Sequence, residues 1–283
     1  MQIVIASGKG GTGKTTVTSN LGYVLSHKQK VTLADCDAEE PNLGIFFPCT
    51  PETEDVTVIV PAVIEDQCLH CGACGEFCRF GALTVLKDRV LFFSKLCHSC
   101  GRCFLVCPHL ALEKVPVTVG EIQTCTLSGS LTLVSGRLKE GDVRTTAVIG
   151  AVKTRVEDEQ LVIIDAPPGT ACPFIETIDD VSLCVLVTEP TPFGLHDLTV
   201  AVDVAKIVQV PVAVVINRSD GKDEMIEEYC SEHNLPVLMK IPLDITLLKT
   251  QNAGALIAER DPGWFIRFTE LGDKILACAE GFR

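Results

Sequence analysis

The sequence predicts a doubly wound α/β domain with a mostly parallel sheet, interrupted by a small cysteine-rich insert. Three observations support this prediction. Short apolar segments alternate with segments of helical spacing, which is typical of parallel strands joined by crossover helices. Eight of the 15 cysteines lie between Cys68 and Cys107. The length of 283 residues corresponds to about two domains, which fits one large sheet domain carrying a smaller module.

The expected elements follow in chain order. Before the insert, we expect a strand, a helix and a second strand, at residues 2–7, 14–27 and 31–37. After the insert, the expected strands lie at residues 161–164, 182–187, 212–216 and 236–241. The expected helices lie near residues 142–156, 195–208, 223–234 and 261–280. The last helix is amphipathic around Trp264 and Phe268, and its acidic residues favour packing on the sheet over binding to a membrane.

Composition excludes several classes of protein. A hydrophobic fraction of 47% and a mean hydropathy of +0.31 exclude a disordered chain. No apolar run reaches the roughly 18 residues that a membrane span requires, and the first residues lack the features of a signal peptide, so a cytoplasmic protein without membrane attachment is expected. The net charge of −13 disfavours nucleic acid and favours a basic protein partner.

The insert is bounded by prolines and contains an internal duplication. Pro48, Pro51 and Pro61 mark its entry, Pro116 marks its exit, and residues 52–55 are expected to form a polar linker. The two halves of the insert repeat with an offset of 29 residues from Cys68 to Cys97. The expected division is residues 1–55 and 117–283 for the two parts of the sheet domain and 56–116 for the insert.

A phosphate-binding loop follows the first strand and precedes the first helix. Its residues are Gly8, Lys9, Gly10, Gly11, Thr12, Gly13, Lys14, Thr15 and Thr16. The pattern fits G-x-x-x-x-G-K-[ST], in which backbone N–H groups and the helix N-terminus bind phosphates. We expect Lys14 to contact the β- and γ-phosphates and the Thr15 hydroxyl to ligate Mg²⁺. The alternative is a glycine-rich turn that only caps a helix.

Carboxylates follow two of the predicted strands. Asp35 and Asp37 end the second strand, and Asp165 ends the strand at residues 161–164. The carboxyl ends of parallel strands form the crevice where α/β sheets bind ligands, so these carboxylates are candidates for holding magnesium and orienting water. They could instead be helix caps or turn formers.

The clustered cysteines follow the spacing of bacterial 4Fe–4S ferredoxins, in which the fourth cysteine of each run ligates the other cluster. One predicted cluster is bound by Cys68, Cys71, Cys74 and Cys107, and the other by Cys97, Cys100, Cys103 and Cys78. Arg79 stands where proline is usual. Zinc is the alternative, because CxxC pairs also bind zinc.

The loop and the carboxylates together resemble those of a known family. Lys9 in the loop, Asp35-Cys-Asp37, and Asp165 before Ala-Pro-Pro-Gly169 are similar to the deviant Walker A, switch I and switch II segments of the MinD/ParA/Mrp and nitrogenase iron-protein group. The segment beginning Thr188-Glu-Pro-Thr resembles the strand and loop that follow. With its insert, the chain is similar to MinD-superfamily P-loop ATPases that contain an inserted ferredoxin domain.

The resemblance implies a role for individual residues. Lys9 would contact the nucleotide of a partner chain across an ATP-sandwiched homodimer, and Asp37 would position the attacking water. Asp35 and Asp165 would hold magnesium through water. Asn217, followed by Arg218, matches the position used for adenine recognition, with a plain strand-end turn as the alternative.

The other seven cysteines occur singly. Six are expected as small buried residues, namely Cys36, Cys49, Cys125, Cys184, Cys230 and Cys278. Cys172 lies seven residues after Asp165, where the nitrogenase iron-protein family has a ligand of its bridging cluster. No second cysteine matches that family's other ligand, so a structural thiol is the expected role.

Three functions agree with these features. The first is an ATPase that couples its nucleotide state to electron transfer through two 4Fe–4S clusters to a redox partner protein, with ATP, ADP and Mg²⁺ as cofactors. The second is an iron–sulfur cluster carrier or metallocentre-maturation ATPase, although relatives of that type use a CxxC motif that is absent after Cys107. The third is a MinD-like ATPase that organises other molecules in space.

Overall fold

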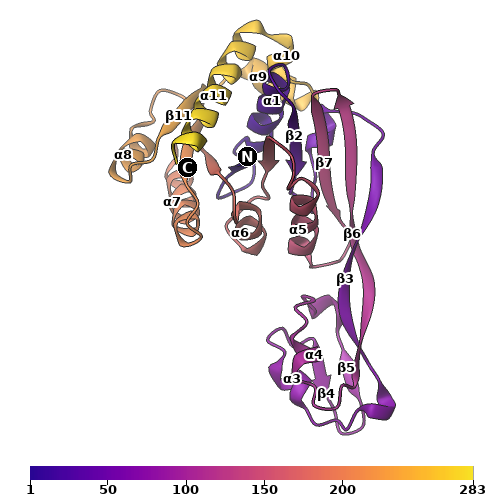
Figure 1. The fold of residues 1–283 in the computed structure, drawn as a ribbon. Coiled ribbons are helices and arrows are strands. Elements are labelled where there is room, and N and C mark those ends of the chain that lie inside the picture. Colours follow the sequence, from indigo (N-terminus) through magenta and orange to yellow (C-terminus); the bar gives the residue numbers. More distant parts are fainter. Residues whose placement is uncertain (283) are drawn as a thin grey trace.

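A large sheet forms the centre of the molecule, for which a computed structural model describes residues 1–282 (Figure 1). Its nine strands within these residues run in the order β11, β10, β9, β1, β8, β2, β7, β6 and β3. The seven parallel strands are β1 (Gln2–Ala6), β2 (Val31–Asp35), β7 (Leu131–Leu138), β8 (Val162–Asp165), β9 (Leu183–Thr188), β10 (Val212–Ser219) and β11 (Val237–Pro242). At one edge, β6 (Leu112–Ser128) is antiparallel to both β7 and β3 (Glu52–Val63). The predicted mostly parallel α/β sheet is confirmed.

Helices cover both faces of the sheet. One face carries α1 (Lys14–Ser26), α2 (Leu43–Phe46), α9 (Ile245–Asn252), α10 (Ile257–Arg260) and α11 (Pro262–Gly281), and the other carries α5 (Thr145–Arg155), α6 (Cys172–Ile178), α7 (Pro192–Ile207) and α8 (Glu224–Glu232). Alternate residues of β1 enter different cores, because Ile3 and Ile5 pack on the first face while Val4 and Ala6 pack on the second. The buried strands are therefore apolar throughout, as a doubly covered sheet requires.

The C-terminal helix α11 packs on the protein, as predicted. Trp264, Phe268, Leu271 and Ile275 are buried in the first core. Asp261 caps the helix by accepting hydrogen bonds from the backbone N–H groups of the second and third helical residues. Among residues 1–282, no helix combines the length and the apolar character needed to cross a membrane.

The edge strands β3 and β6 were not predicted, and neither was their neighbour β7, whose apolar run is interrupted by Ser135, Gly136 and Arg137. Residues 52–55, expected as a linker, are the start of β3, and the expected boundaries after residues 55 and 116 fall inside β3 and β6. The two strands pair from Glu52 opposite Thr124 to Val63 opposite Leu112. They extend beyond the sheet as a two-stranded arm (Figure 1). Many of its residues are exposed, so neither strand has the apolar pattern that identified the six predicted strands.

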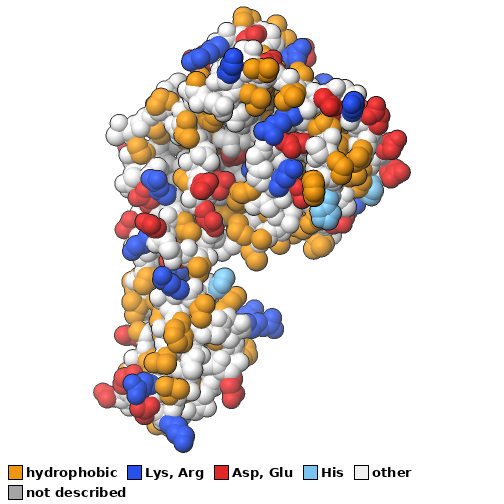
Figure 2. All heavy atoms as spheres, turned by 180° about the vertical axis from the view of Figure 1, so that it is seen from behind, with side chains coloured by type: hydrophobic (Ala, Val, Ile, Leu, Met, Phe, Trp, Pro, Cys, Tyr) orange, Lys and Arg blue, Asp and Glu red, His pale blue; other side chains and the backbone are white. Residues whose placement is uncertain are grey.

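The arm carries a small module at its tip, which we call the cysteine module (residues 64–111). It contains α3 (Ala73–Phe77), α4 (Arg102–Val106), and the hairpin of β4 (Leu83–Val85) and β5 (Val90–Phe92). Its buried apolar cluster is limited to Val60 of the arm with Ala82 and Cys97. Figure 2 shows apolar side chains gathered on the exposed face of this part of the molecule.

The backbone of the cysteine module repeats with the offset predicted from its sequence. The 3₁₀ turns Glu65–Gln67 and Ser94–Leu96 correspond, as do α3 and α4. The left-handed residues correspond as well: His70 with Ser99 (φ 50° and 53°) and Gly72 with Gly101 (φ 90° and 73°). Each pair is separated by the 29 residues that separate Cys68 from Cys97, so the duplication extends from sequence to backbone conformation.

Candidate functional site

The glycine-rich loop lies at the carboxyl end of β1 and leads into α1. Gly11 and Gly13 have φ angles of 79° and 97°, which other residues adopt rarely. A side chain on Gly13 would also collide with the Asn217 amide, whose nitrogen would lie 2.2 Å from a Cβ atom. The loop borders a cavity of about 340 Å³ that Lys14, Thr15, Asp37, Asn217 and Arg218 help to line. This volume suits a small-molecule ligand.

Three carboxylates meet beside the loop. The Thr15 hydroxyl donates a hydrogen bond to Asp165 Oδ2 (2.7 Å), and the Thr18 hydroxyl donates to Asp165 Oδ1 (3.0 Å). Asp35 accepts hydrogen bonds from the backbone N–H groups of Asp37 (3.1 Å) and Leu43 (2.9 Å). Asp35 and Asp165 lie opposite each other on β2 and β8. The structure thus joins the predicted carboxylates through neighbouring strand ends.

Burial perturbs the acidity of all three carboxyl groups. Desolvation raises the pKa of Asp35 well above its usual value, and the nearby Asp165 raises it further. Desolvation also raises the pKa of Asp165, which the Lys14 charge partly offsets. The pKa of Asp37 rises to about 6, mainly through desolvation, again opposed by Lys14. Crowded carboxylates of this kind are typical of cation sites and of catalytic groups.

Two buried hydroxyl groups beside the loop have no hydrogen-bond partner. Thr12 Oγ1 and Thr16 Oγ1 are buried and have no hydrogen-bond partner within the protein. Thr16 Oγ1 lies about 4.0 Å from the position that a Cβ atom would occupy on Gly13. Buried hydroxyls without partners are costly, and phosphate oxygens could accept hydrogen bonds from them. The residues present therefore fit a Mg²⁺-nucleotide, with Thr15, Asp35 and Asp165 as the candidate residues around the metal.

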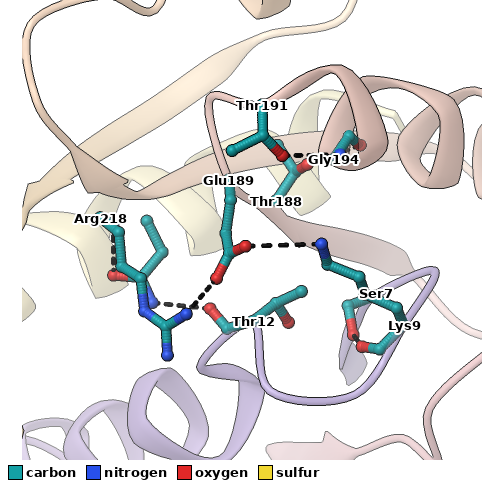
Figure 3. A network of polar contacts seen from close by, with 9 residues as sticks. Ser7, Lys9, Thr12, Thr188, Glu189, Thr191, Gly194 and Arg218 are labelled. Atoms are coloured by element: carbon teal, nitrogen blue, oxygen red, sulfur yellow. Dashed lines mark hydrogen bonds and ion pairs between the residues drawn. The ribbon is translucent and has the colours of Figure 1, made fainter.

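Lys9 and Arg218 share one acidic partner, Glu189 (Figure 3). Lys9 Nζ lies 3.5 Å from Glu189 Oε2, and Arg218 forms a close ion pair with Glu189 Oε1. Asn217 donates a hydrogen bond to the Thr12 carbonyl (2.6 Å) and accepts one from the Arg218 backbone (2.9 Å). Asn217 therefore fixes the loop as well as bordering the cavity. Sequence reasoning assigned no role to Glu189, since its contacts arise only when the ends of β1, β9 and β10 meet.

The clustered cysteines line two separate hollows in the cysteine module. One hollow is lined by Cys68, Cys71, Cys74 and Cys107, together with apolar residues such as Val85 and Leu112. The other is lined by Cys78, Cys97, Cys100 and Cys103, together with Phe92 and Phe104. The fourth cysteine of each sequence run thus joins the first three of the other run. This is the grouping that the ferredoxin spacing predicts.

The thiols of each hollow influence one another. Burial raises the pKa of Cys103 to about 11, and the nearby Cys97 and Cys100 add to the rise. Among residues 1–282, no three His, Cys, Asp or Glu side chains converge closely enough to hold a single metal ion. A 4Fe–4S cluster has a different demand, because its four thiolates bind four separate iron atoms. Four thiols around each hollow are the donor set of such a cluster.

The remaining cysteines divide into three groups. Cys36, Cys184 and Cys230 are buried, as predicted, and Cys278 is half-buried. Cys172 is exposed at the first position of α6. The prediction of single thiols is wrong for Cys49 and Cys125, which form a disulfide with a Cα–Cα distance of 6.4 Å. The unpredicted pairing of β3 with β6, beginning at Glu52 and Thr124, brings these two cysteines together.

A known protein family matches most of the chain. Residues 3–257 match the model described as the CobQ/CobB/MinD/ParA nucleotide binding domain. An uncharacterised protein of Methanocaldococcus jannaschii is 29% identical over 246 residues, covering 86% of each chain. A protein of the same organism named iron-sulfur cluster carrier protein is 24% identical, covering 99% of this chain and 85% of its own.

Solved structures share the fold. The cell division ATPase MinD of Pyrococcus furiosus superposes with a TM-score of 0.58 at 20% identity, covering 98% of both chains. The septum site-determining protein MinD of Pyrococcus horikoshii, solved with Mg-ADP, gives a TM-score of 0.59 at 20% identity, covering 97% of this chain and 95% of its own. The chain therefore shares its overall fold with these solved structures.

Proposed function

Since this chain belongs to the CobQ/CobB/MinD/ParA nucleotide-binding family, we propose that it is an ATP-hydrolysing iron–sulfur protein. Its nucleotide state controls electron transfer through two 4Fe–4S clusters in the cysteine module to a partner protein. The observation that carries the proposal is a series of backbone hydrogen bonds that runs from the segment after Asp37, through the end of β7, to the arm that bears the thiols.

At the nucleotide end, the loop N–H groups and Lys14 bind the phosphates. Thr15 is a direct ligand for Mg²⁺, while Asp35 and Asp165 hold the ion through water. Asp37 accepts a hydrogen bond from the attacking water and orients it. Two chains sandwich ATP, and Lys9 of each contacts the nucleotide of its partner. Asn217 and Arg218 line the side of the cavity proposed for adenine.

At the module end, the two sets of four cysteines hold one cluster each. The clusters supply one-electron chemistry when bound. The aromatic residues Phe92 and Phe104 border the hollow of Cys97 and limit its contact with water. The overall negative charge favours a redox partner with a basic surface.

The connection starts directly after Asp37. The carbonyl of Ala38 accepts a hydrogen bond from the Leu138 N–H (2.8 Å). Leu138 is paired with Gly120 of β6, and the Lys139 N–H donates to the Val119 carbonyl (2.8 Å). Val119 lies at the irregularity where the register between β3 and β6 shifts. A movement of the Asp37 segment would therefore act on the arm where it leaves the sheet.

A second contact links the same segment to α5. Thr145, the first residue of α5, donates a hydrogen bond from its hydroxyl to Glu39 (3.0 Å). The preceding residue, Arg144, is buried in an ion pair with Asp142, which is the main cause of its raised pKa, and the Cys97 thiol adds to that rise. Thr145 therefore ties the first turn of α5 to the segment that follows Asp37. Because α5 also packs against β6, β7 and β3, this contact gives the Asp37 segment a second route to the strands of the arm.

Cluster transfer is the second candidate function. Cys71 and Cys100 are exposed, which leaves one corner of each proposed cluster open to an acceptor, and several relatives carry the name iron-sulfur cluster carrier protein. A spatial-organising role receives less support, because the apolar face of α11 is buried against the core and is not available to a membrane.

Anaerobic EPR with and without MgATP, together with a hydrolysis assay, tests the proposal. We expect two 4Fe–4S signals whose potentials, or rates of electron transfer to an artificial acceptor, differ between the ATP and ADP states. Potentials and rates that are indifferent to the nucleotide would contradict the coupling. Rapid loss of iron and sulfide to an apo-ferredoxin would favour the carrier function instead.

A further inference from the structure

We propose that Glu189 is a positioning residue that restrains Lys9 in the single chain and thereby sets how much nucleotide is needed for two chains to pair. The inference rests on the proposed function, in which Lys9 contacts the nucleotide of a partner chain. It adds a regulatory carboxylate to that site.

Glu189 is placed between two cationic side chains from different parts of the chain. Lys9 belongs to the phosphate-binding loop after β1, and Arg218 lies in β10. The Glu189 side chain is only 13% exposed, against 34% for Lys9 and 42% for Arg218. A carboxylate with so little contact with water depends on its cationic partners. The three side chains converge in Figure 3.

The backbone that carries Glu189 is firmly held. Its carbonyl accepts a hydrogen bond from the Thr191 N–H (2.8 Å). Thr191 caps α7 by accepting from the Gly194 N–H (3.0 Å), and the Thr188 hydroxyl donates to the Gly194 carbonyl (2.9 Å). Gly194 approaches so closely that a Cβ atom on it would lie 2.2 Å from the Glu189 carbonyl oxygen. The carboxylate is therefore the fixed member, and Lys9, with its long flexible side chain, is the member that moves.

The two ion pairs differ in a way that permits release of Lys9. Arg218 contacts Glu189 closely and donates a hydrogen bond to it, whereas Lys9 lies at 3.5 Å, outside the hydrogen-bonded contacts. When Lys9 leaves, Glu189 keeps Arg218 and is not stranded as an unpaired buried charge. Release therefore costs only the weaker interaction. This arrangement suits a restraint that nucleotide and a partner chain can overcome.

The test replaces the charge but keeps the shape, with Glu189→Gln. Pairing is followed by sedimentation velocity of the full chain over a range of magnesium ATPγS concentrations. We expect the variant to reach half-pairing at about fivefold less nucleotide than the wild type, at the lower end of typical coupling between sites. Glu159→Gln, in an exposed turn, is the matched control.

A second variant assigns the effect to Lys9. In a Lys9→Ala background, Glu189→Gln should leave the remaining pairing unchanged, since the restrained side chain is gone. An unchanged threshold in Glu189→Gln, with an unchanged melting temperature, would overturn the inference. A raised threshold would overturn it too, because Glu189 would then support the paired state. A wild-type chain that stays monomeric at saturating nucleotide contradicts the proposed pairing itself, a result distinct from both.

Discussion

The nucleotide site and the cysteine module are built in opposite ways. Thr15, Asp35 and Asp165 are far apart in the sequence and meet because three neighbouring strands end together. The eight clustered thiols lie within one stretch of 40 residues, and tight turns that repeat every 29 residues position them. The carboxylates at the strand ends are fully buried, whereas two of the thiols are exposed.

The difference shows which parts of the molecule need their ligands in order to fold. The nucleotide site stands on two large apolar cores that hold the strand ends in place without ligand. The cysteine module contributes Ala82 and Cys97 to a buried apolar cluster that is completed by Val60 of the arm, which is a small core for a stable unit. Metal binding can supply the missing folding free energy in modules of this kind. We therefore expect the two regions to respond independently to substitutions.

The largest effect is expected for Lys14→Ala. Lys14 is buried beside the loop and lowers the pKa of both Asp37 and Asp165, and its charge is proposed to stabilise the transferred phosphoryl group. Hydrolysis should fall by at least about 100-fold, while the iron content stays unchanged. A phosphate-release assay and iron analysis measure the two effects. Lys28→Ala, which removes only an exposed ion pair with Asp273, serves as the control; comparable hydrolysis in both variants would contradict the role of Lys14.

The reciprocal test is Cys107→Ser in the module. Cys107 lines the hollow of Cys68, Cys71 and Cys74, although it belongs to the second sequence run. The variant should lose about half of its iron and keep the other cluster, with hydrolysis in the absence of a redox partner unchanged within about twofold. Iron analysis and EPR of anaerobically prepared protein measure the loss.

The control for this experiment is Cys172→Ala, because Cys172 is exposed and lies outside both hollows. It should retain all of the iron. Loss of iron in Cys172→Ala would make Cys172 a ligand. Loss of the cluster of Cys97, Cys100 and Cys103 in Cys107→Ser would contradict the crossed pairing of the two runs.

The same contrast explains what the sequence could predict. The loop, the carboxylates and six of the seven parallel strands were accessible because a glycine pattern and continuous apolar segments reflect local conformation and burial directly. The seventh, β7, was missed although most of its residues are buried, because Ser135, Gly136 and Arg137 interrupt its apolar run. The arm was missed because β3 and β6 expose many of their residues and therefore lack an apolar pattern. Glu189 and the disulfide of Cys49 with Cys125 were missed for a related reason, since both contacts depend on which strands become neighbours.

A smaller effect is expected for the disulfide that ties the sheet end of the arm. It joins cysteines separated by 76 residues, and closing a loop of that length stabilises a protein typically by about 2–4 kcal/mol. Reduction, or the double variant Cys49→Ser and Cys125→Ser, should lower the free energy of unfolding of the sheet domain by about 2 kcal/mol, since β3 and β6 stay paired. Urea unfolding followed by circular dichroism measures it. Dithiothreitol should have no effect on the double variant. If the oxidised wild type and the double variant unfolded at the same urea midpoint, the prediction would be wrong.

The smallest expected effect on stability concerns Asp37, and it tests whether burying this ionised carboxylate destabilises the nucleotide-free site. Burial raises the pKa of Asp37 from 3.8 to about 6, so the folded chain binds this proton more tightly than the unfolded chain does. The stability that protonated Asp37 contributes is complete below about pH 4 and is lost as the pH rises to about 6.

Asp37→Asn removes a charge that is unfavourable above pH 6. It should stabilise the nucleotide-free chain at pH 8 by about 1 kcal/mol, a value discounted for the partial exposure of the group. The gain should disappear at pH 3.5, where Asp37 is mostly protonated. Urea unfolding at the two pH values provides the measurement, and an equal gain at both would show that shape, and not charge, is responsible. Because Asp37 is proposed to orient the attacking water, the same substitution should also lower hydrolysis, so one variant separates the stability gained by removing the charge from its effect on catalysis.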